Sequence, residues 1–203
     1  MKKKTSRSWV IKQHRDPYFK QAKSLNYRSR SAFKLIELNE KFNLIKNNQT
    51  ILDLGSSPGG WSQVIKKFSK NCKIIAVDIN SMDPIDGVVF KKKDFLSNIF
   101  DLQPGDYSEK FDLILSDMAE KTTGNKSLDC IRTNHLGFTV IDFSTKFIKS
   151  EGHVISKLFM GEDFLSVKKF AQKKFKKVDF FKPNSSRKDS KETYIHCKGL
   201  KAL

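Results

Sequence analysis

Cysteine is scarce in this 203-residue sequence, and long apolar runs are missing. Cys72, Cys130 and Cys197 are odd in number and have no histidine or cysteine neighbours at metal-ligand spacing, so the sequence predicts neither a disulfide framework nor a zinc site. No segment approaches the roughly 20 apolar residues of a membrane span, and the first ten residues form no apolar signal segment. We therefore expect a cytoplasmic monomer that binds no metal and no membrane.

Acidic residues are also few. The chain carries 22 Asp and Glu against 39 Lys and Arg, which gives a formal net charge of +17 at pH 7 and an isoelectric point near 9.8. Residues 1–34 hold eleven Lys or Arg against the single acid Asp16, and residues 168–191 hold ten against Asp179 and Asp189. Basic clusters of this kind are typical of surfaces that bind phosphates, so we expect a polyanionic partner, with nucleic acid as the first choice.

Hydrophobic periodicity predicts alternating strands and helices. A helix capped by Ser29 or Ser31 runs to about Phe42, and further helices are predicted between Trp61 and Phe68, Leu136 and Ile148 (with a stop at Glu151-Gly152), and Phe164 and Phe175. The predicted strands are Thr50–Gly55, Lys73–Asp78, Gly87–Phe90, Phe111–Asp117, His153–Phe159, Lys177–Phe181 and Thr193–Lys198.

The last two of these strands are joined by a loop without a helix. The order predicts an α/β protein with a Rossmann-like, doubly wound seven-stranded sheet that ends in an antiparallel hairpin, and such sheets bind ligands at the carboxyl ends of their central strands. The length suits one domain with a substantial core. We expect a partly flexible basic extension over residues 1–27 and a single domain over residues 28–203.

A glycine-rich turn follows the first predicted strand. Such a turn lets the backbone approach a ligand closely and directs helix N–H groups toward it. In the segment Gly55-Ser56-Ser57-Pro58-Gly59-Gly60, Ser57 occupies the position of the middle glycine of the dinucleotide fingerprint, where a pyrophosphate would press against the backbone. The sequence therefore disfavours a nicotinamide dinucleotide.

Two aspartates follow the next two strands. Asp78 closes the second strand 23 residues after Gly55, where a carboxylate can accept both hydroxyls of an adenosine ribose. Asp94, at the turn after the third strand, is placed to accept a hydrogen bond from an adenine amino group. S-adenosylmethionine has this ribose and no pyrophosphate, so we expect it as the cofactor and S-adenosylhomocysteine as its product.

The fourth strand indicates which nucleophile would receive a methyl group. It ends in Ser116-Asp117-Met118-Ala119, which differs from the Asp/Asn-Pro-Pro-aromatic clamp typical of enzymes that methylate base amines. None of the three cysteines follows a proline, as the nucleophilic cysteine of pyrimidine carbon methyltransferases often does. A hydroxyl group remains as the acceptor.

Four charged residues lie at the edges of apolar segments, where packing alone does not require them: Lys34, Asp117, Lys157 and Glu192. If they converge in space, they form a catalytic site in which Lys157 acts as general base or orients a lone pair of the acceptor oxygen. The alternative for a single lysine is a side chain that reaches from an apolar face to water, and for Glu192 an edge-strand charge that deters aggregation.

These segments resemble the FtsJ-type ribose 2′-O-methyltransferases, and the similarity extends over nearly the whole chain. It is carried by an ordered set of motifs: Arg28–Leu35, Asp53–Gln63, Asp78 with Met82-Asp83-Pro84-Ile85, Ser116–Ala119, Lys157–Phe159 with Gly161-Glu162, and Lys182-Pro183 through Ser185-Ser186-Arg187 to Glu192. The resemblance implies that Lys34, Asp117, Lys157 and Glu192 surround the target hydroxyl. It also implies cofactor contacts by Gly59, Trp61, Asp78, Asp94 and Asp117, and for Trp61 a plain core position is the alternative.

The same resemblance implies the substrate, which is a ribose 2′-hydroxyl in large-subunit (23S) ribosomal RNA, with a uridine as the expected nucleotide and late ribosome assembly as the expected stage. One departure is visible, because Glu120-Lys121 stands where relatives usually have Pro-Asn or a similar small polar pair. Two alternatives stay open. The protein could be an RNA-binding assembly factor with an inert methyltransferase fold, or a 2′-O-methyltransferase that acts on tRNA or an mRNA cap.

Overall fold

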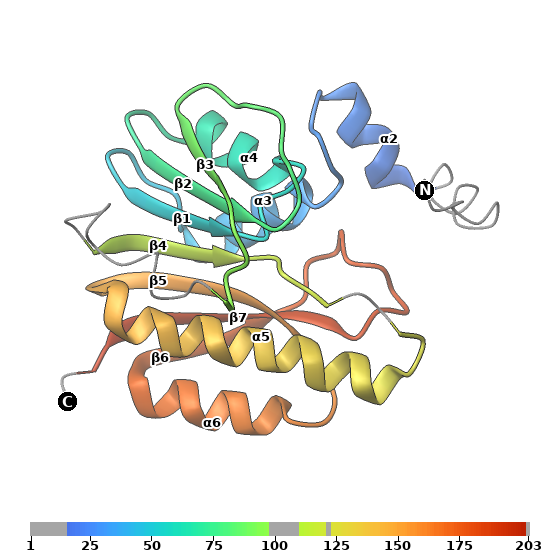
Figure 1. The fold of residues 1–203 in the computed structure, drawn as a ribbon, viewed down its shortest axis with the longest axis vertical. Helices are drawn as coiled ribbons and strands as arrows, with labels where there is room; N and C mark the ends of the chain where they lie inside the picture. The colour runs from blue at the N-terminus through green and yellow to red at the C-terminus, as the bar shows by residue number, and fades with distance from the viewer. Residues whose placement is uncertain (1–15, 98–109, 121–122, 202–203) are drawn as a thin grey trace.

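A computed structural model of the chain describes residues 16–97, 110–120 and 123–201 (Figure 1). Within these ranges, seven strands form one sheet in the order β3-β2-β1-β4-β5-β7-β6. The strands are β1 (Thr50–Leu54), β2 (Lys73–Asp78), β3 (Val88–Lys92), β4 (Phe111–Ser116), β5 (Ile148–Phe159), β6 (Phe175–Phe181) and β7 (Glu192–Leu200). The helices are α2 (Pro17–Ser24), α3 (Ala32–Phe42), α4 (Gly60–Phe68), α5 (Lys126–Phe147) and α6 (Phe164–Lys174). The predicted α/β class and doubly wound sheet are confirmed.

The direction of the strands determines where a ligand can bind. Strands β1 to β5 pair in parallel, whereas β7 pairs antiparallel with both β5 and β6, so the predicted terminal hairpin is the β6–β7 pair. From β1 the chain first builds toward β3 and then returns to add β4 and β5 on the other side. The strand order therefore reverses between β1 and β4, and the crevice at their carboxyl ends is the usual ligand site of such a sheet.

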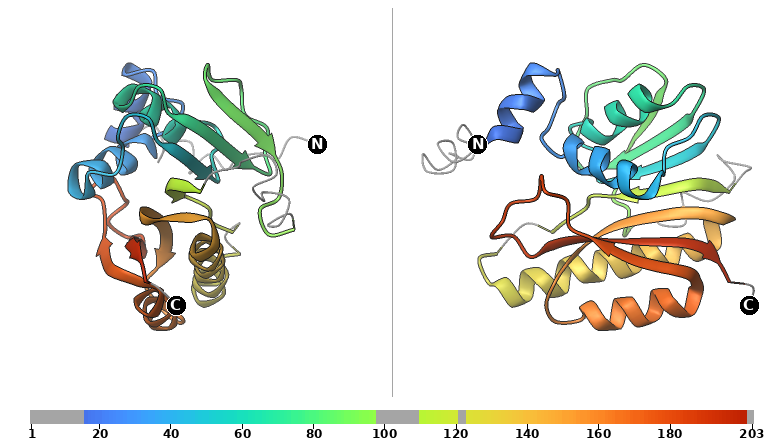
Figure 2. Two further views of the ribbon diagram at one scale, coloured as in Figure 1. Left: turned by 90° about the vertical axis from the view of Figure 1, so that its left-hand side faces the viewer. Right: turned by 180° about the vertical axis from the view of Figure 1, so that it is seen from behind.

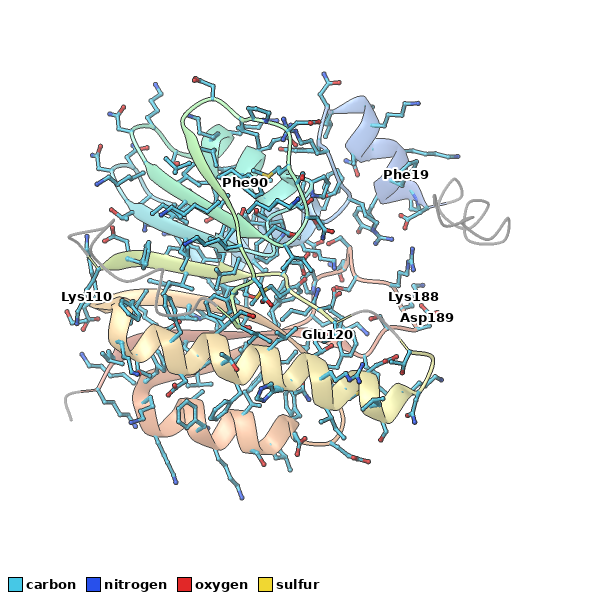
Figure 3. All side chains as sticks on the ribbon, viewed as in Figure 1. Phe19, Phe90, Lys110, Glu120, Lys188 and Asp189 are labelled. Carbon is cyan, nitrogen blue, oxygen red and sulfur yellow. The ribbon has the colours of Figure 1, made fainter. Side chains whose placement is uncertain are left out.

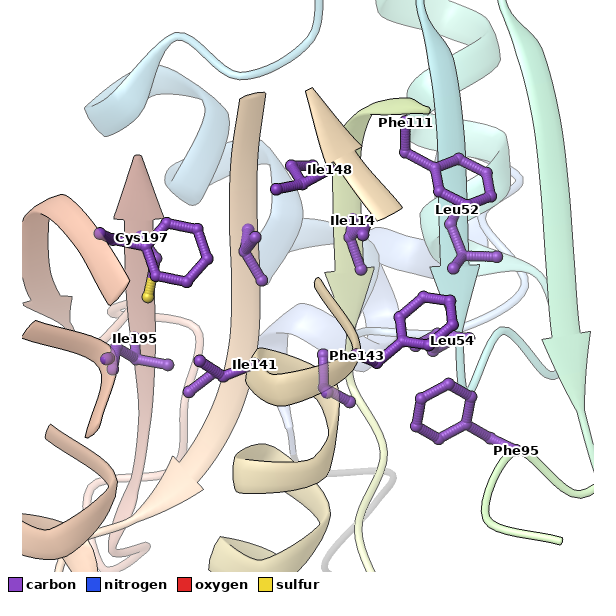
Figure 4. Packing of buried hydrophobic residues seen from close by; sticks show 14 of the residues in the cluster. Leu52, Leu54, Phe95, Phe111, Ile114, Ile141, Phe143, Ile148, Ile195 and Cys197 are labelled. Carbon is purple, nitrogen blue, oxygen red and sulfur yellow. The ribbon is translucent and has the colours of Figure 1, made fainter. Parts of the chain in front are cut away.

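Helices cover both faces of this sheet. Helices α5 and α6 lie over one face, and α3 and α4 lie over the other, as the views from the front and from behind show (Figures 1 and 2). The core under α5 includes Leu52, Ile114 and Ile141 (Figure 4), and the core under α3 includes Leu35 and Ile155. Each of these five side chains is fully buried, which stabilises the fold by about 1.5–3 kcal/mol per side chain.

The border between α5 and β5 differs from the sequence prediction. The strand begins at Ile148, not at His153, and the predicted helix stop at Glu151-Gly152 lies inside it. The pairing of β5 with β4 changes register there, because Phe111 lies opposite Ile148 while Leu113 lies opposite His153. Glycine at 152 fits this irregularity, since a β-carbon there would come within 3.1 Å of the backbone oxygen of Asp112.

The beginning of α5 also differs. The helix starts at Lys126, well before the predicted Leu136, because the Asn125 side chain accepts hydrogen bonds from the backbone N–H groups of Ser127 and Leu128. In α4, the spacing of Trp61, Val64, Ile65 and Phe68 predicts that all four side chains are buried, but Phe68 is 46% exposed. The predicted ends of α3, α4 and α6 agree with the structure to within one or two residues, whereas those of α5 do not.

The N-terminal region contains a helix that periodicity did not predict. Residues 1–15 of the expected extension lie outside the described residues, but α2 follows directly, capped by Asp16, and Tyr18 of α2 packs against Phe33 of α3 with 5.5 Å between ring centroids. Ser31 occupies the N-cap position of α3 without capping it, because its hydroxyl hydrogen-bonds the hydroxyl of Ser29 at 2.7 Å.

Candidate active site

A cleft of about 440 Å³ lies at the carboxyl ends of β1, β2 and β4. Its wall includes Gly55, Asp78, Asp94, Asp117 and Lys157. Gly55 turns the chain out of β1 with a left-handed φ of +73°, and a β-carbon at this position would come within 2.7 Å of the Met118 side chain. Only glycine therefore lets the β1 turn and the end of β4 approach this closely.

Asp78 and Asp94 line the part of the cleft where β2 and β3 end. The Oδ2 atom of Asp78 accepts a hydrogen bond from the backbone N–H of Ser57 at 2.9 Å, which ties the end of β2 to the glycine-rich turn. Asp94 accepts from the backbone N–H of Leu96 at 3.0 Å. Ile79 and Leu96 line the same part of the cleft with side chains that are 57% and 40% exposed, which is high for large aliphatic groups. This end of the cleft combines fixed carboxylates with apolar surface.

Two of the residues implied by the family resemblance, Gly59 and Trp61, do not line the cleft. Trp61 is 2% exposed, its indole N–H donates to the backbone oxygen of Ser31 at 2.8 Å, and its ring packs beside Tyr194. The Trp61 side chain therefore has a packing role, and a ligand contact by this residue would have to use its backbone N–H, which lies in the first turn of α4. Gly59 precedes α4 in a left-handed conformation with φ +112°.

The sheet register brings three of the four charged residues to one place. Ser116 of β4 lies opposite Ser156 of β5, so that Asp117 and Lys157 follow side by side. Lys157 lies directly opposite Tyr194 in the antiparallel β5–β7 pair, and Glu192 lies two residues before Tyr194 on the same face of β7. Lys157 shares a face with Ile155, whose side chain packs in the core under α3. The three residues therefore face the helix that carries Lys34.

The four charged residues, hereafter the tetrad (Lys34, Asp117, Lys157 and Glu192), form two ion pairs. The ammonium of Lys34 lies 2.7 Å from Oε1 and 2.8 Å from Oε2 of Glu192. The ammonium of Lys157 lies 3.1 Å from Oδ1 of Asp117 and also donates to the backbone oxygen of Asp117. Both pairs are mostly buried, so their charges are poorly screened by water.

Tyr194 connects the two ion pairs. Its hydroxyl donates to Oδ1 of Asp117 at 2.6 Å, and the Lys34 ammonium lies 5.9 Å from its ring centroid. Burial, reinforced by the charges of Asp117 and Glu192, raises the pKa of Tyr194 well above its usual value. Tyr194 therefore stays protonated and acts as a hydrogen-bond donor. The four members of the tetrad are thus brought together around a buried tyrosine.

The charge state of Asp117 follows from the same contacts. Burial alone raises the pKa of this carboxyl, but the positive charges of Lys157 and Lys34 and the hydrogen bond from Tyr194 outweigh burial and hold its pKa below the usual range of an aspartate. Asp117 is therefore ionised at neutral pH, and it lines the cleft beside Lys157.

Sequence reasoning did not find the residues that support the tetrad. Tyr194 could have been found, because strand alternation places it on the same face as Glu192. Ser186, whose hydroxyl donates to Oε1 of Glu192 at 2.8 Å, gives no such signal. Its loop is fixed by Glu37 of α3, which accepts from the backbone N–H of Ser185 at 2.9 Å.

Several further expectations concern the rest of the molecule. Glu120, whose side chain is labelled in Figure 3, lines the same cleft, and Lys121 lies outside the described residues.

The three cysteines are free thiols. The described residues hold no cluster of three or more His, Cys, Asp or Glu that could bind a metal ion. Of the helices within the described ranges, none combines the length and the apolar character that crossing a membrane requires.

Comparisons with known proteins identify the family of this chain. Residues 27–200 match the model of the family described as FtsJ-like methyltransferase. The protein named ribosomal RNA large subunit methyltransferase E of Pelagibacter ubique is 40% identical over 205 residues, which cover 98% of this chain and 99% of the relative. Its namesake in Rickettsia akari is 42% identical over 203 residues, which cover 96% of this chain and 89% of the relative.

Solved structures show the same fold. A crystal structure from Plasmodium falciparum, assigned as a ribosomal RNA methyltransferase, superposes with a TM-score of 0.76 at 35% identity, over 86% of this chain and 98% of that one. Human methyltransferase-like protein 13, solved in complex with S-adenosylhomocysteine, shares the fold alone, with a TM-score of 0.59 at 16% identity over 74% of this chain and 71% of that one. By the family match and by its full-length relatives, this chain belongs to the FtsJ-like methyltransferases.

Proposed function

We propose that this protein transfers a methyl group from S-adenosylmethionine to the 2′-hydroxyl of a ribose, at a uridine of large-subunit (23S) ribosomal RNA, in the cytoplasm and late in ribosome assembly. The observation that carries the proposal is the meeting of two ammonium groups and two carboxylates around Tyr194, next to a cleft of nucleoside size. Full-length relatives at about 40% identity that carry the name of a large-subunit rRNA methyltransferase support the choice of RNA.

The cleft fits the proposed methyl donor. Asp78 would accept the ribose hydroxyls and Asp94 the adenine amino group, because both line the cleft and an ionised carboxylate only accepts hydrogen bonds. Ile79 and Leu96 offer exposed apolar surface for the faces of the adenine. When bound, S-adenosylmethionine supplies an electrophilic methyl group on a sulfonium. Asp117 lies in the wall of the same cleft and would mark the end at which the acceptor enters.

The tetrad would hold the acceptor. The Lys157 ammonium is fixed by two oxygens of Asp117 and has a third N–H to donate to a ribose oxygen. This arrangement favours the orienting role, in which Lys157 directs an oxygen lone pair at the methyl carbon. Transfer would form the oxygen–methyl bond as the sulfur–methyl bond breaks, and the hydroxyl proton would be released to solvent. Alignment of this kind can supply most of the rate enhancement that a reactive sulfonium requires.

Charge supports the RNA partner. The net charge of +17 far exceeds what solubility needs, and Lys34 and Glu192 line a second cavity of about 200 Å³ together with Arg30 and Arg187. A phosphate beside a ribose in this position would meet the exposed guanidinium of Arg187, whereas the Arg30 guanidinium is already paired with Asp16 and donates to the backbone oxygen of Ser185.

The test is transfer of tritium from labelled S-adenosylmethionine to large ribosomal subunits taken from a strain that lacks the gene for this protein. We expect label in the large-subunit RNA, and none when subunits from the parent strain are used. Tight binding to the subunits without transfer would instead support an inert assembly factor. Transfer to tRNA or capped mRNA, with none to the subunits, would support the other acceptor classes.

A further inference from the structure

Arg28 makes an unusual set of contacts for a residue in a basic RNA-binding protein. Its guanidinium donates to three backbone oxygens, those of Pro58 at 3.2 Å, Asp83 at 2.6 Å and Pro84 at 2.8 Å. Its own backbone N–H donates to the side-chain oxygen of Gln63 at 2.8 Å, which fixes the residue against α4. No other side chain for which the structure gives contacts donates to three backbone carbonyls.

The three oxygens come from two segments that flank the proposed donor site. Pro58 lies in the glycine-rich turn between β1 and α4, and Asp83 and Pro84 lie in the segment that leaves β2 after Asp78. The same two segments are joined directly by Ser57, whose backbone N–H donates to Asp78 and whose hydroxyl donates to the backbone oxygen of Ser81 at 3.1 Å. Arg28 therefore joins the two segments that position Asp78, the carboxylate proposed to bind the ribose.

The turn is built to receive this guanidinium. Gly59 has a φ of +112°, and a β-carbon there would lie 2.9 Å from Nη1 of Arg28 and 2.8 Å from the Ile85 side chain. A residue other than glycine would displace the arginine or the loop. Because a guanidinium has five N–H donors and three of its hydrogen bonds end on carbonyls, little of it is left for a bidentate phosphate contact.

We propose that Arg28 is a positioning residue for the methyl donor and not a phosphate ligand for RNA. It holds the glycine-rich turn and the segment after β2 together, and it acts on the donor through Asp78 and Ser57. The inference rests on the proposed function, since it assumes that the cleft binds S-adenosylmethionine. It gives different roles to Arg28 and Arg187, which both lie in basic segments of the sequence. Arg28 would position the donor site, whereas Arg187 is exposed, lines the cavity beside Lys34 and Glu192, and would bind a phosphate of the RNA.

The test compares Arg28→Ala, Arg28→Lys and Arg187→Ala by two measurements, the Kd for S-adenosylhomocysteine from calorimetry and the slope of log K against log salt for binding to large-subunit RNA. For Arg28→Ala we expect the Kd to rise ~10–100-fold, because hydrogen bonds from a charged group are lost, and the salt slope to stay unchanged. Arg28→Lys, which can reach only some of the carbonyls, should lie between. Arg187→Ala should leave the Kd unchanged and reduce the slope by about 0.7–0.9.

Steady-state kinetics distinguish a loss of donor positioning from a general defect in folding. If Arg28 positions the donor, Arg28→Ala raises KM for S-adenosylmethionine and recovers kcat to within about threefold at saturating donor. An unchanged Kd, or a salt slope that falls as in Arg187→Ala, overturns the inference. If Arg28→Ala does not fold, Arg28→Lys decides, and a wild-type Kd in that variant counts against the proposal. Failure of the unmodified protein to bind S-adenosylhomocysteine would refute the proposed function itself.

Discussion

The hydroxyl of Tyr194 donates a hydrogen bond of 2.6 Å to Oδ1 of Asp117, the same oxygen that lies 3.1 Å from the Lys157 ammonium. One carboxylate oxygen thus receives two donors from neighbouring strands, and each donor limits where the other can lie. Tyr194 therefore helps to position Lys157 through Asp117, whose backbone oxygen also accepts a hydrogen bond from Lys157.

Replacement of Tyr194 by Phe should therefore change the pH dependence of the reaction. The hydrogen bond from Tyr194 stabilises ionised Asp117, so its loss raises the pKa of Asp117. If transfer needs Asp117 ionised, the acid limb of the kcat/KM profile moves to higher pH, and kcat at neutral pH falls by up to ~10-fold as Lys157 loses its constraint. Tyr18→Phe, a hydroxyl deletion in α2, is the matched control and should leave the profile in place. An acid limb at the same pH in Tyr194→Phe would show that the hydroxyl has no such role.

Replacement of Lys157 by Ala should abolish transfer and preserve donor binding. The variant removes the group that orients the acceptor oxygen, so we expect the single-turnover rate to fall by at least ~100-fold. Lys149→Ala is the control, since Lys149 lies on the same strand and pairs with a different aspartate, Asp112, at 2.8 Å. Near-normal turnover in Lys157→Ala, with an unchanged Kd for S-adenosylhomocysteine, would remove Lys157 from the mechanism.

Asp53 should make stability depend on pH. Burial raises the pKa of this carboxyl to about 7, with Asp117 and Asp78 adding to the shift and the hydrogen bond from Ser62 opposing it. Between pH 4 and 7 the folded state then binds more protons than the unfolded state, so the free energy of unfolding falls as pH rises through this range. Asp53→Asn removes the titration, and its stability relative to the unmodified protein should increase from pH 4 to pH 8 by up to ~4 kcal/mol.

Urea unfolding of both proteins at several pH values measures this difference. Burial lowers the pKa values of His153 and His196 to about 4, so below about pH 6.5 these two residues make the free energy of unfolding rise with pH. Both proteins contain these histidines, so their contribution cancels in the difference between the two proteins. A stability difference that is the same at pH 4 and pH 8 would mean that folding does not raise the pKa of Asp53.

Removal of residues 1–15 should weaken RNA binding without affecting the fold. The cut keeps Asp16, which caps α2, and removes six basic residues: Lys2, Lys3, Lys4, Arg7, Lys12 and Arg15. Since counterion release scales with the number of phosphates neutralised, the slope of log K against log salt should become shallower by as much as ~4. Thermal melting is the control for folding. An unchanged slope would show that these residues make no phosphate contact.

The sequence was sufficient for the sheet and for the tetrad, for different reasons. The strands are mostly apolar and bounded by turn residues, so their order along the chain could be read directly, whereas the place of β7 between β5 and β6 could not. Lys34, Asp117, Lys157 and Glu192 were visible as charges where burial disfavours charge. The irregularity in β5 could not be predicted, because a glycine such as Gly152 is as typical of the end of a helix as of an irregular strand.

Of the residues that support the site, some could be identified from the sequence and others could not. Tyr194 shares a strand face with Glu192, and alternation alone could have identified it. The contacts of Arg28 with Pro58 and Asp83 span 30 and 55 positions in the sequence and end on backbone oxygens, which carry no residue-specific signal. For Trp61 the sequence left both a cofactor contact and a core position open, and the structure places its side chain in the core.

The central claim, that the tetrad delivers a methyl group to a ribose oxygen, is tested most directly by the chemical position of the transferred label. Large-subunit RNA labelled by the purified protein with tritiated S-adenosylmethionine is hydrolysed in alkali, which cleaves after every nucleotide that has a free 2′-hydroxyl. The account predicts that the label is recovered in an alkali-resistant dinucleotide. Label in a mononucleotide with a methylated base would contradict it.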